Sequence, residues 1–455
     1  MEKWFKLKEH GTDVRTEIVA GLTTFLSMAY ILAVNPNILS AGGMDSNGVF
    51  LATAIASAIA TFIMAFLANY PIALSAGLGL NAYFAYTVCL GELGGEPDAF
   101  KVALTAVFVE GLIFILLSIF KVREEIINGI PSNLKNGITV GIGLFIGFIG
   151  LRGANIVIPS DATTVELGSF TDPGMSLALI GFLIILILSH FRVKGSVLIG
   201  IIATWVLGMI AEATGWYVVN PDAGVYSVIP SSIVGFDFSG LSKTAFQLDF
   251  GWVAKNFISF VAIVFAFLYV DLFDTIGTVV GVADKAGLLD KNGKLPRAGK
   301  VLMADAIGTT AGALLGTSTV TSFVESGAGV AEGGKTGLTA LTTGVMFVLS
   351  LILAPLFLTI PGFATAPALI YVGMLMISSA KNIKFEGDIA DVAGAYMAII
   401  MMPLTYSIAT GIMFAILTWV IIKTFTGKAK DVGPVMWVVA LLFALRIVTL
   451  ITNFQ

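Results

Sequence analysis

Runs of about twenty apolar residues recur along the whole sequence, and each is long enough to cross the roughly 30 Å hydrocarbon core of a bilayer as a helix. Of the 455 residues, 57% are hydrophobic and only 12% are charged, whereas a soluble domain carries about 25% charged residues. The first run, 18–39, follows a basic N-terminus and is longer than the apolar core of a signal peptide, so we interpret it as a retained transmembrane helix. The sequence therefore predicts an all-α polytopic membrane protein whose solvent is the lipid bilayer.

The apolar runs form two sets, separated by the polar stretch 215–256. A further apolar stretch at 434–451 leaves the total at about 14, uncertain by one. The first set of seven comprises 18–39, 48–68, 75–90, 102–120, 133–151, 175–190 and 196–214, and the second set of seven comprises 257–282, 301–316, 319–334, 337–359, 363–380, 390–408 and 409–426.

Charge supports this assignment of spans and gives it a direction. Lys and Arg collect in alternate loops, beginning with the N-terminus, which the positive-inside rule places in the cytoplasm. Because seven is odd, the second set enters the membrane from the opposite face to the first. This predicts two inverted seven-helix repeats, an arrangement that places the substrate site of a transporter near the midplane between the repeats.

The third and tenth segments differ from ordinary membrane helices. The stretches 74–84 and 316–329 are rich in Gly, Ser, Thr and β-branched residues, which favour extended backbone over helix. Non-helical backbone at membrane depth is tolerated only where protein or a cavity surrounds it, so we expect a short strand followed by a half-helix at each place. The alternative is that the small residues merely allow close helix packing.

Several carboxylates lie inside or beside apolar spans, where each ionised group costs roughly 2.5–3.5 kcal/mol on insertion scales. Asp271 and Asp274 are three residues apart and should share a helix face, so that one of them holds a proton. Glu325 lies in the second interrupted segment, where it either binds substrate and carries a coupling proton or caps the half-helix locally. Asp305 either caps the ninth span or orients the other carboxylates. At the following turn, Glu332 is expected to pair with Lys335.

Aromatic side chains on or beside the interrupted segments suit a flat ligand, because a planar uncharged base offers a π-face for stacking. Tyr83, Phe84 and Phe323 are the candidates. Cys89 is the only cysteine and only two histidines are present, so we expect no metal site and no cofactor. A net charge of −4 without a basic stripe predicts no nucleic-acid partner, and the chain has no soluble catalytic domain that would make it an enzyme.

Three stretches carry a specific resemblance that extends over essentially the whole chain. They are Gly79–Phe84, Asp271–Thr278, and Thr321–Ser326 together with Gly333–Gly337. In these stretches the sequence resembles the azaguanine-type purine permeases, a branch of the nucleobase cation symporter-2 family.

That resemblance implies an architecture of two domains. Residues 1–125 and 252–360 would form a core domain, and 126–251 and 361–455 a gate domain. It also implies import of adenine, guanine or hypoxanthine with protons across the bacterial inner membrane, an elevator-like movement of the core against the gate, and a homodimer formed largely through the gates.

The resemblance further assigns roles to individual residues. It places substrate binding on Asp274, with Gly277 behind it, and on Glu325, flanked by the backbone of Phe323 and Val324. The family's acidic residue near the start of the ninth span falls on Asp305. The uracil and xanthine branches have Glu where this chain has Asp274, and the shorter side chain leaves room for a two-ring base. The substrate-binding candidates are thus Asp274, Glu325, Phe323, Val324, Phe84, Asn81 and Tyr83, and the proton-coupling candidates are Glu325, Asp274, Asp271 and Asp305.

An anion exchanger or sulfate-type carrier on the same inverted-repeat architecture is the alternative function. Anion carriers need a positive site, whereas the predicted midplane of this chain holds acidic residues. The sequence leaves open which purine is preferred and how many protons accompany it.

Overall fold

The computed structural model describes residues 2–119, 131–220, 225–288 and 295–452, and these residues are mostly helical. The predicted domain boundary at 125/126 lies outside the described residues. The long helices are α2 (Val14–Met28), α3 (Ile31–Ala41), α4 (Ser46–Ile63), α6 (Ala99–Ile119), α8 (Ser132–Gly153), α9 (Pro173–His190), α10 (Ser196–Ala213), α13 (Phe257–Lys285), α14 (Ala298–Leu315), α16 (Gly337–Ser350), α18 (Gly362–Ile377), α19 (Ile389–Leu404), α20 (Ile408–Phe425) and α21 (Pro434–Thr452).

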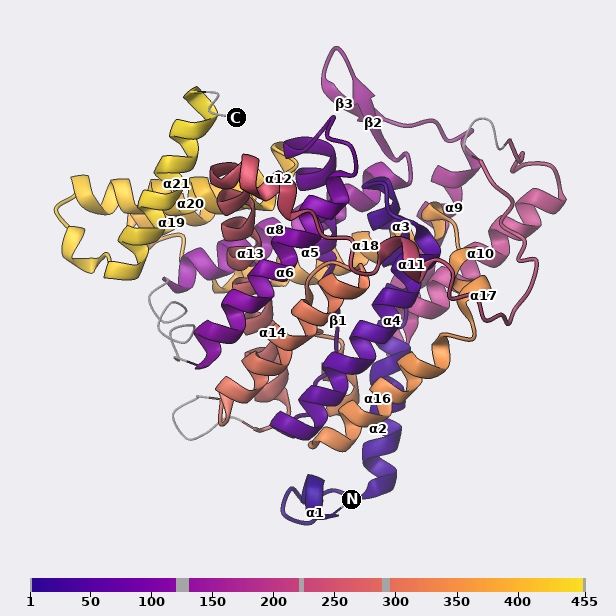
Figure 1. Ribbon diagram of the computed structural model, residues 1–455. Helices are drawn as coiled ribbons and strands as arrows, with labels where there is room; N and C mark the ends of the chain where they lie inside the picture. The colour runs from indigo at the N-terminus through magenta and orange to yellow at the C-terminus, as the bar shows by residue number, and fades with distance from the viewer. Residues whose placement is uncertain (1, 120–130, 221–224, 289–294, 453–455) are drawn as a thin grey trace.

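Shorter elements connect these helices. They are α1 (Glu2–Phe5), η1 (Met64–Ala68), α5 (Leu78–Ala82), η2 (Tyr83–Glu92), α11 (Leu241–Thr244), α12 (Phe250–Lys255), α15 (Ser326–Ala331), α17 (Ala354–Leu358), η4 (Ser378–Asn382), η5 (Ala429–Asp431) and the strands β1 (Leu74–Ala76), β2 (Val157–Ser160), β3 (Thr164–Leu167) and β4 (Val320–Ser322). The strands β2 and β3 form a hairpin that projects beyond the helices, at the opposite end from the N-terminus in Figure 1.

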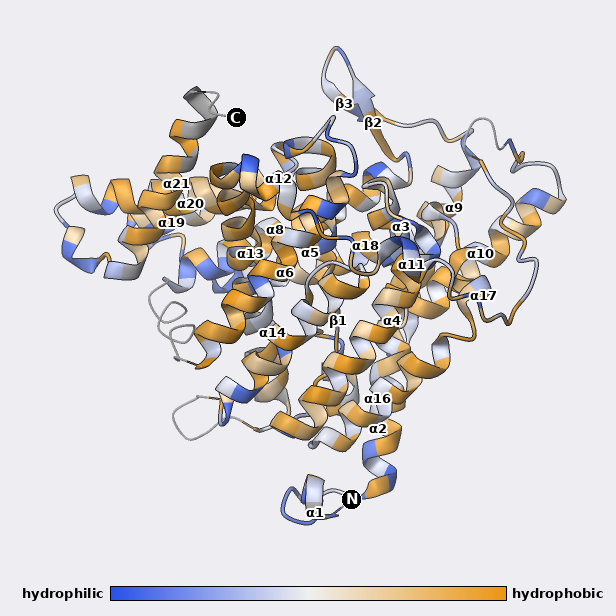
Figure 2. Ribbon diagram, in the orientation of Figure 1, coloured by the Kyte–Doolittle hydropathy of each residue, from blue (hydrophilic) through white to orange (hydrophobic). Residues whose placement is uncertain are grey.

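Within the described ranges, eight helical segments are long and apolar enough to cross a membrane, and four shorter apolar helices accompany them. Figure 2 shows apolar residues along most of the helical surface and hydrophilic residues concentrated at helix ends and loops. A multi-pass membrane protein follows from this distribution. The predicted first span lies within a single apolar span, Val14–Ala41, in which a tighter turn at Ala29 and Tyr30 separates α2 from α3.

The helices pack in two groups. The helices α2, α4, α6, α14 and α16 pack mainly on one another, through the pairs α6 with α14, α4 with α14 and α2 with α16. The helix α8 packs against α18 and α19, α19 packs against α20, and α9 packs against α10 and α18. Contacts of α8 with α5 and α13 join the two groups, and they lie close to the β1–β4 pair.

Both predicted interruptions are confirmed, because β1 is followed by α5 and β4 by α15. The strands pair antiparallel, with Ser75 opposite Thr321. Backbone groups that these segments cannot bond within a helix are therefore satisfied by each other, which is the condition for extended backbone at this depth. Gly316, at φ +97°, ends α14 in a left-handed conformation and turns the chain into the extended segment.

A buried carboxylate ties α2 to the start of α16. Glu17 is fully buried and accepts backbone N–H groups from Lys335 at 2.9 Å, Thr336 at 3.3 Å and Thr339 at 3.1 Å. These are donors that a helix start leaves unpaired, so Glu17 caps α16 from another helix.

One of the ion pairs at the helix ends has a different partner from the one predicted. Glu332 pairs with Lys194 at 2.6 Å, so the predicted pair with Lys335 is wrong. At the start of α19, Asp388 accepts from Lys428 at 2.7 Å and from Lys423 at 2.9 Å. These two ammonium groups and the backbone N–H of Ala390 hold the pKa of the Asp388 carboxyl well below its usual range.

Candidate substrate site

The β1–β4 pair brings two carboxylates from distant parts of the chain to one place. Asp274 lies on α13, and a Cβ added at Gly77, between β1 and α5, would lie 3.4 Å from its Oδ2 atom. The same Cβ would lie 2.7 Å from Cγ2 of Thr321 on β4, so only glycine leaves room at this position. The Asp274 carboxylate therefore reaches the point where β1, β4 and α5 meet, and the residue as a whole is partly exposed.

Glu325 is the second carboxylate, and it lies immediately before α15. It occupies the N-cap position of that helix, but its side chain makes no capping hydrogen bond to it. Instead, its Oε1 accepts a hydrogen bond from the hydroxyl of Tyr30. Glu325 is partly exposed, and it lies close enough to Asp274 for the two carboxylates to interact electrostatically.

Tyr30 is a site residue that the sequence did not suggest. It lies at the break between α2 and α3, is 1% exposed, and is within electrostatic range of both Glu325 and Asp274. No Gly or Pro stands next to Tyr30 to signal the break between α2 and α3. The nearest such residue is Pro36, inside α3. The structure thus brings Asp274, Glu325 and Tyr30 together around one point.

Asp271 and Asp305 lie behind this point and are fully buried. The hydroxyl of Thr275 is 3.0 Å from Asp271 Oδ1, 3.1 Å from Asp305 Oδ2 and 2.8 Å from Oγ1 of Thr321. Because a hydroxyl has one hydrogen, Thr275 donates to one carboxylate at a time. This cluster links α13, α14 and β4, and Asp305 also lies within electrostatic range of Asp274.

The capping interpretation of Asp305 is wrong. The helix α14 begins at Ala298 and its N-cap is Arg297, so Asp305 lies two turns inside the helix. The other interpretation, in which Asp305 orients the carboxylates of the site, stays a prediction; its Oδ2 lies 3.1 Å from the Thr275 hydroxyl.

The remaining predicted residues fall into two sets. Phe323 and Val324 stand beside Glu325, and Val324 is 51% exposed. Asn81, Tyr83 and Phe84 are enclosed. Tyr83 and Phe84 pack on Phe267 of α13 at centroid distances of 4.8 and 6.3 Å, and Asn81 accepts a hydrogen bond from Ser318. They form the wall behind the site.

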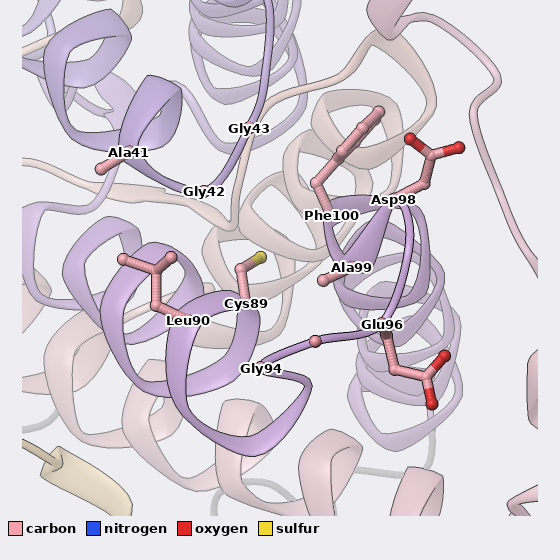
Figure 3. Close-up of a pocket in the computed structure, with 11 residues that line it drawn as sticks. Ala41, Gly42, Gly43, Cys89, Leu90, Gly94, Glu96, Asp98, Ala99 and Phe100 are labelled. Carbon is pink, nitrogen blue, oxygen red and sulfur yellow. The ribbon is translucent and has the colours of Figure 1, made fainter.

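Two further observations concern metal-binding groups and a hollow elsewhere in the protein. No group of three or more His, Cys, Asp or Glu side chains suited to a metal ion occurs in the part of the chain that the structure describes. A hollow of about 360 Å³ lies elsewhere, between the ends of α3 and η2 and the start of α6 (Figure 3), where Cys89, Glu96 and Asp98 are among its lining residues. It shares no residue with the Asp274–Glu325 pair.

Apolar helices around a buried polar crossing that brings two carboxylates together are the arrangement of a membrane carrier. The profile of the permease family matches residues 15–414, and the chain belongs to this family, that of the xanthine/uracil permeases. Relatives that match it over nearly their full length are named as permeases, which are transporters and not enzymes.

The chain is 44% identical to the guanine/hypoxanthine permease PbuO of Bacillus subtilis over 445 residues, covering 97% of this chain and 99% of that protein. It is 40% identical to the adenine permease AdeP of Escherichia coli over 451 residues, covering 98% and 96%. Among solved structures, the transmembrane domain of the cyanobacterial bicarbonate transporter BicA is similar, with a TM-score of 0.64 and 17% identity over 87% of this chain and 97% of that one. At that identity the likeness concerns the fold alone.

Proposed function

We propose that this chain imports purine nucleobases together with protons. Relatives that match it over nearly their full length are named adenine and guanine/hypoxanthine permeases. The observation that carries the proposal is the convergence of Asp274 and Glu325 at the β1–β4 crossing, with Tyr30 between them. Carboxylates accept hydrogen bonds from N–H groups, and every purine nucleobase presents at least one ring N–H.

In the proposed complex the purine ring lies between Asp274 and Glu325. The ring's N–H groups donate to the two carboxylates, and the backbone of Phe323 and Val324 meets its acceptor atoms. Val324 is exposed beside Glu325 and is available for this contact. Tyr83 and Phe84, enclosed against Phe267, hold α5 and η2 in place behind the ring.

Proton coupling follows from the cost of moving charge. An ionised carboxylate is expensive at the bilayer centre, so a loaded site crosses most readily after one carboxylate has taken up a proton. Glu325 and Asp274 are the first candidates for that proton because they would contact the purine, and Asp271 and Asp305 are the second, because Thr275 joins them. The coupling proton and the purine would therefore share one site.

We also propose the two-domain elevator architecture. About 14 segments would form two inverted repeats, with 1–125 and 252–360 as the core and 126–251 and 361–455 as the gate. The separate packing of α2, α4, α6, α14 and α16 from α8, α18, α19 and α20 supports this division. The N-terminus would lie in the cytoplasm, the protein in the inner membrane, and two gates would meet in a homodimer. Anion exchange is not proposed, because the bicarbonate carrier shares only the fold.

Uptake by purified protein in proteoliposomes tests the proposal. With an inward proton gradient, the wild type should accumulate radiolabelled hypoxanthine, and unlabelled adenine or guanine should compete while uracil and sulfate should not. Each charged hydrogen bond is worth about 1.5–3 kcal/mol, so Asp274→Asn or Glu325→Gln should reduce uptake roughly 10- to 100-fold. The matched control is Glu332→Gln, which neutralises a carboxylate paired with Lys194 outside the site.

Two results would overturn the proposal. Sulfate or bicarbonate uptake without purine uptake would move the chain to the anion carriers. Normal, gradient-dependent accumulation in Asp274→Asn or Glu325→Gln would remove that residue from the site.

A further inference from the structure

Three consecutive hydroxyl residues precede β4, and each one contacts a different helix. Thr317 accepts from the amide of Asn35 on α3 at 2.9 Å, Ser318 donates to Asn81 on α5, and Thr319 donates to Glu110 on α6 at 3.0 Å. All three hydroxyl residues are fully buried. The extended segment that leads to Glu325 is thus fixed from three sides before it reaches the site.

The contact of Thr319 is the one that leads directly to the substrate site. Its hydroxyl donates to Oε2 of Glu110, and its backbone carbonyl accepts the N–H of Gly77 at 3.1 Å. Gly77 in turn lies against the Asp274 carboxylate and against Thr321. Two hydrogen bonds and one close approach therefore connect Glu110 to Asp274.

Glu110 is a buried carboxylate outside the pair of Asp274 and Glu325. It is fully buried on α6, next to Gly111, which lies against Thr310 of α14. A buried carboxylate costs several kcal/mol unless the fold uses it. A hydrogen-bonded anchor for the backbone at Gly77 is a use that the geometry supplies.

We propose that Glu110 is a positioning residue for the substrate site. Through Thr319 it sets the place of Gly77, and thereby the space into which Asp274 and the bound ring fit. This inference rests on the proposed purine transport. Glu110 does not touch the substrate, and its loss weakens binding by displacing the β1–β4 crossing.

The test compares KM and Vmax for hypoxanthine in proteoliposomes, per molecule of reconstituted protein. Thr319→Val removes the hydroxyl at nearly constant volume and should raise KM about 10-fold with Vmax within about twofold, the size expected for one hydrogen bond to a charged group. Thr319→Ser keeps the hydroxyl and should restore the wild-type KM. Glu110→Leu should match Thr319→Val, and Glu110→Gln, which keeps an acceptor oxygen, should stay near the wild type.

The double variant Glu110→Leu/Thr319→Val makes the test specific, because two residues that act through one hydrogen bond are not additive. Its KM should equal that of either single variant. Ser118→Ala is the control, since Ser118 is a buried hydroxyl on the same helix α6.

The outcomes separate the two levels of inference. If the wild type transports purines and Thr319→Val keeps the wild-type KM, or if Thr319→Ser fails to restore it, the positioning role is wrong. If Glu110→Leu does not accumulate in the membrane, Thr319→Val and Thr319→Ser decide alone. If the wild type neither binds nor transports purines, the proposed function falls and this inference with it.

Discussion

The two interrupted segments have the same backbone plan but different chemistry. The β1 segment is apolar apart from Ser75, whose hydroxyl meets Ser57 of α4 at 2.7 Å, and the backbone N–H of Leu74 donates to Thr61 of the same helix at 3.0 Å. The β4 segment follows three hydroxyl residues that contact α3, α5 and α6, and it ends at Glu325. The β1 segment thus contributes backbone and close packing to the site, whereas the β4 segment contributes hydroxyl groups and a carboxylate.

This difference shows why two interruptions are needed for one site. Extended backbone in a membrane must be paired, and each strand pairs the other. Because β1 pairs with β4 through the backbone, its side chains need not supply hydrogen bonds to β4. Gly77, which follows β1 and has no side chain, leaves space for the Asp274 carboxylate at the crossing. The comparison predicts that substitutions in or next to β1 affect the site by steric clash and backbone displacement. Substitutions around β4 should affect it by removing hydrogen bonds and charge.

The largest effect is expected at Gly77. In Gly77→Ala the new Cβ would lie 2.7 Å from Cγ2 of Thr321, which forces the strands apart and moves Asp274. Purine uptake should fall below about a hundredth of the wild type, because a small misplacement of binding groups costs roughly 100-fold. The control is Gly147→Ala, where nothing lies within 4 Å of the added Cβ. Wild-type uptake by Gly77→Ala would break the comparison.

An intermediate effect is expected at Tyr30. Tyr30→Phe removes the hydroxyl that donates to Glu325 and leaves the ring in place. The KM for hypoxanthine should rise roughly 10-fold, as for the loss of one hydrogen bond to a charged group. Tyr70→Phe, which removes a hydroxyl bonded to the Pro296 carbonyl at 2.6 Å, should leave KM unchanged. An unchanged KM in Tyr30→Phe would mean that this hydroxyl does not act on the site.

The smallest effects are expected at Ser75 and Thr321, which lie opposite each other in the β1–β4 pair. Thr321→Val removes the hydroxyl that meets Thr275 at 2.8 Å and should raise KM about threefold, whereas Ser75→Ala should lower stability by about 1 kcal/mol without changing KM. Thermal unfolding and uptake kinetics on both variants measure the difference. A larger KM change in Ser75→Ala than in Thr321→Val would reverse the assignment of the two strands.

Local composition was enough to predict the interruptions. Gly, Ser and Thr at 74–84 and 316–329 cannot sustain ordinary helices, and the structure has strands there. The carboxylates Asp274 and Glu325 were also predictable, because an acidic residue in an apolar run requires a reason, and the structure brings both to one place.

Long-range partners were not predictable from one sequence. Tyr30 meets Glu325 across 295 residues, and no local pattern around Tyr30 signals that contact. The prediction of Asp305 as a possible cap was wrong because the expected span began at 301, whereas α14 begins at Ala298, next to the charged residues Arg297 and Lys300. The spacing of three residues predicted that Asp271 and Asp274 share a helix face. It could not predict that α14 packs so that the Thr275 hydroxyl lies within hydrogen-bond distance of both Asp271 and Asp305.

Equilibrium binding of radiolabelled hypoxanthine to the purified protein is the most direct test that Asp274 and Glu325 hold one ring together. The expected result is a Kd at least about 10-fold weaker in Asp274→Asn and in Glu325→Gln, with the double variant weaker by less than the product of the two, because both groups contact the same ligand. A wild-type Kd in either single variant would contradict a shared site.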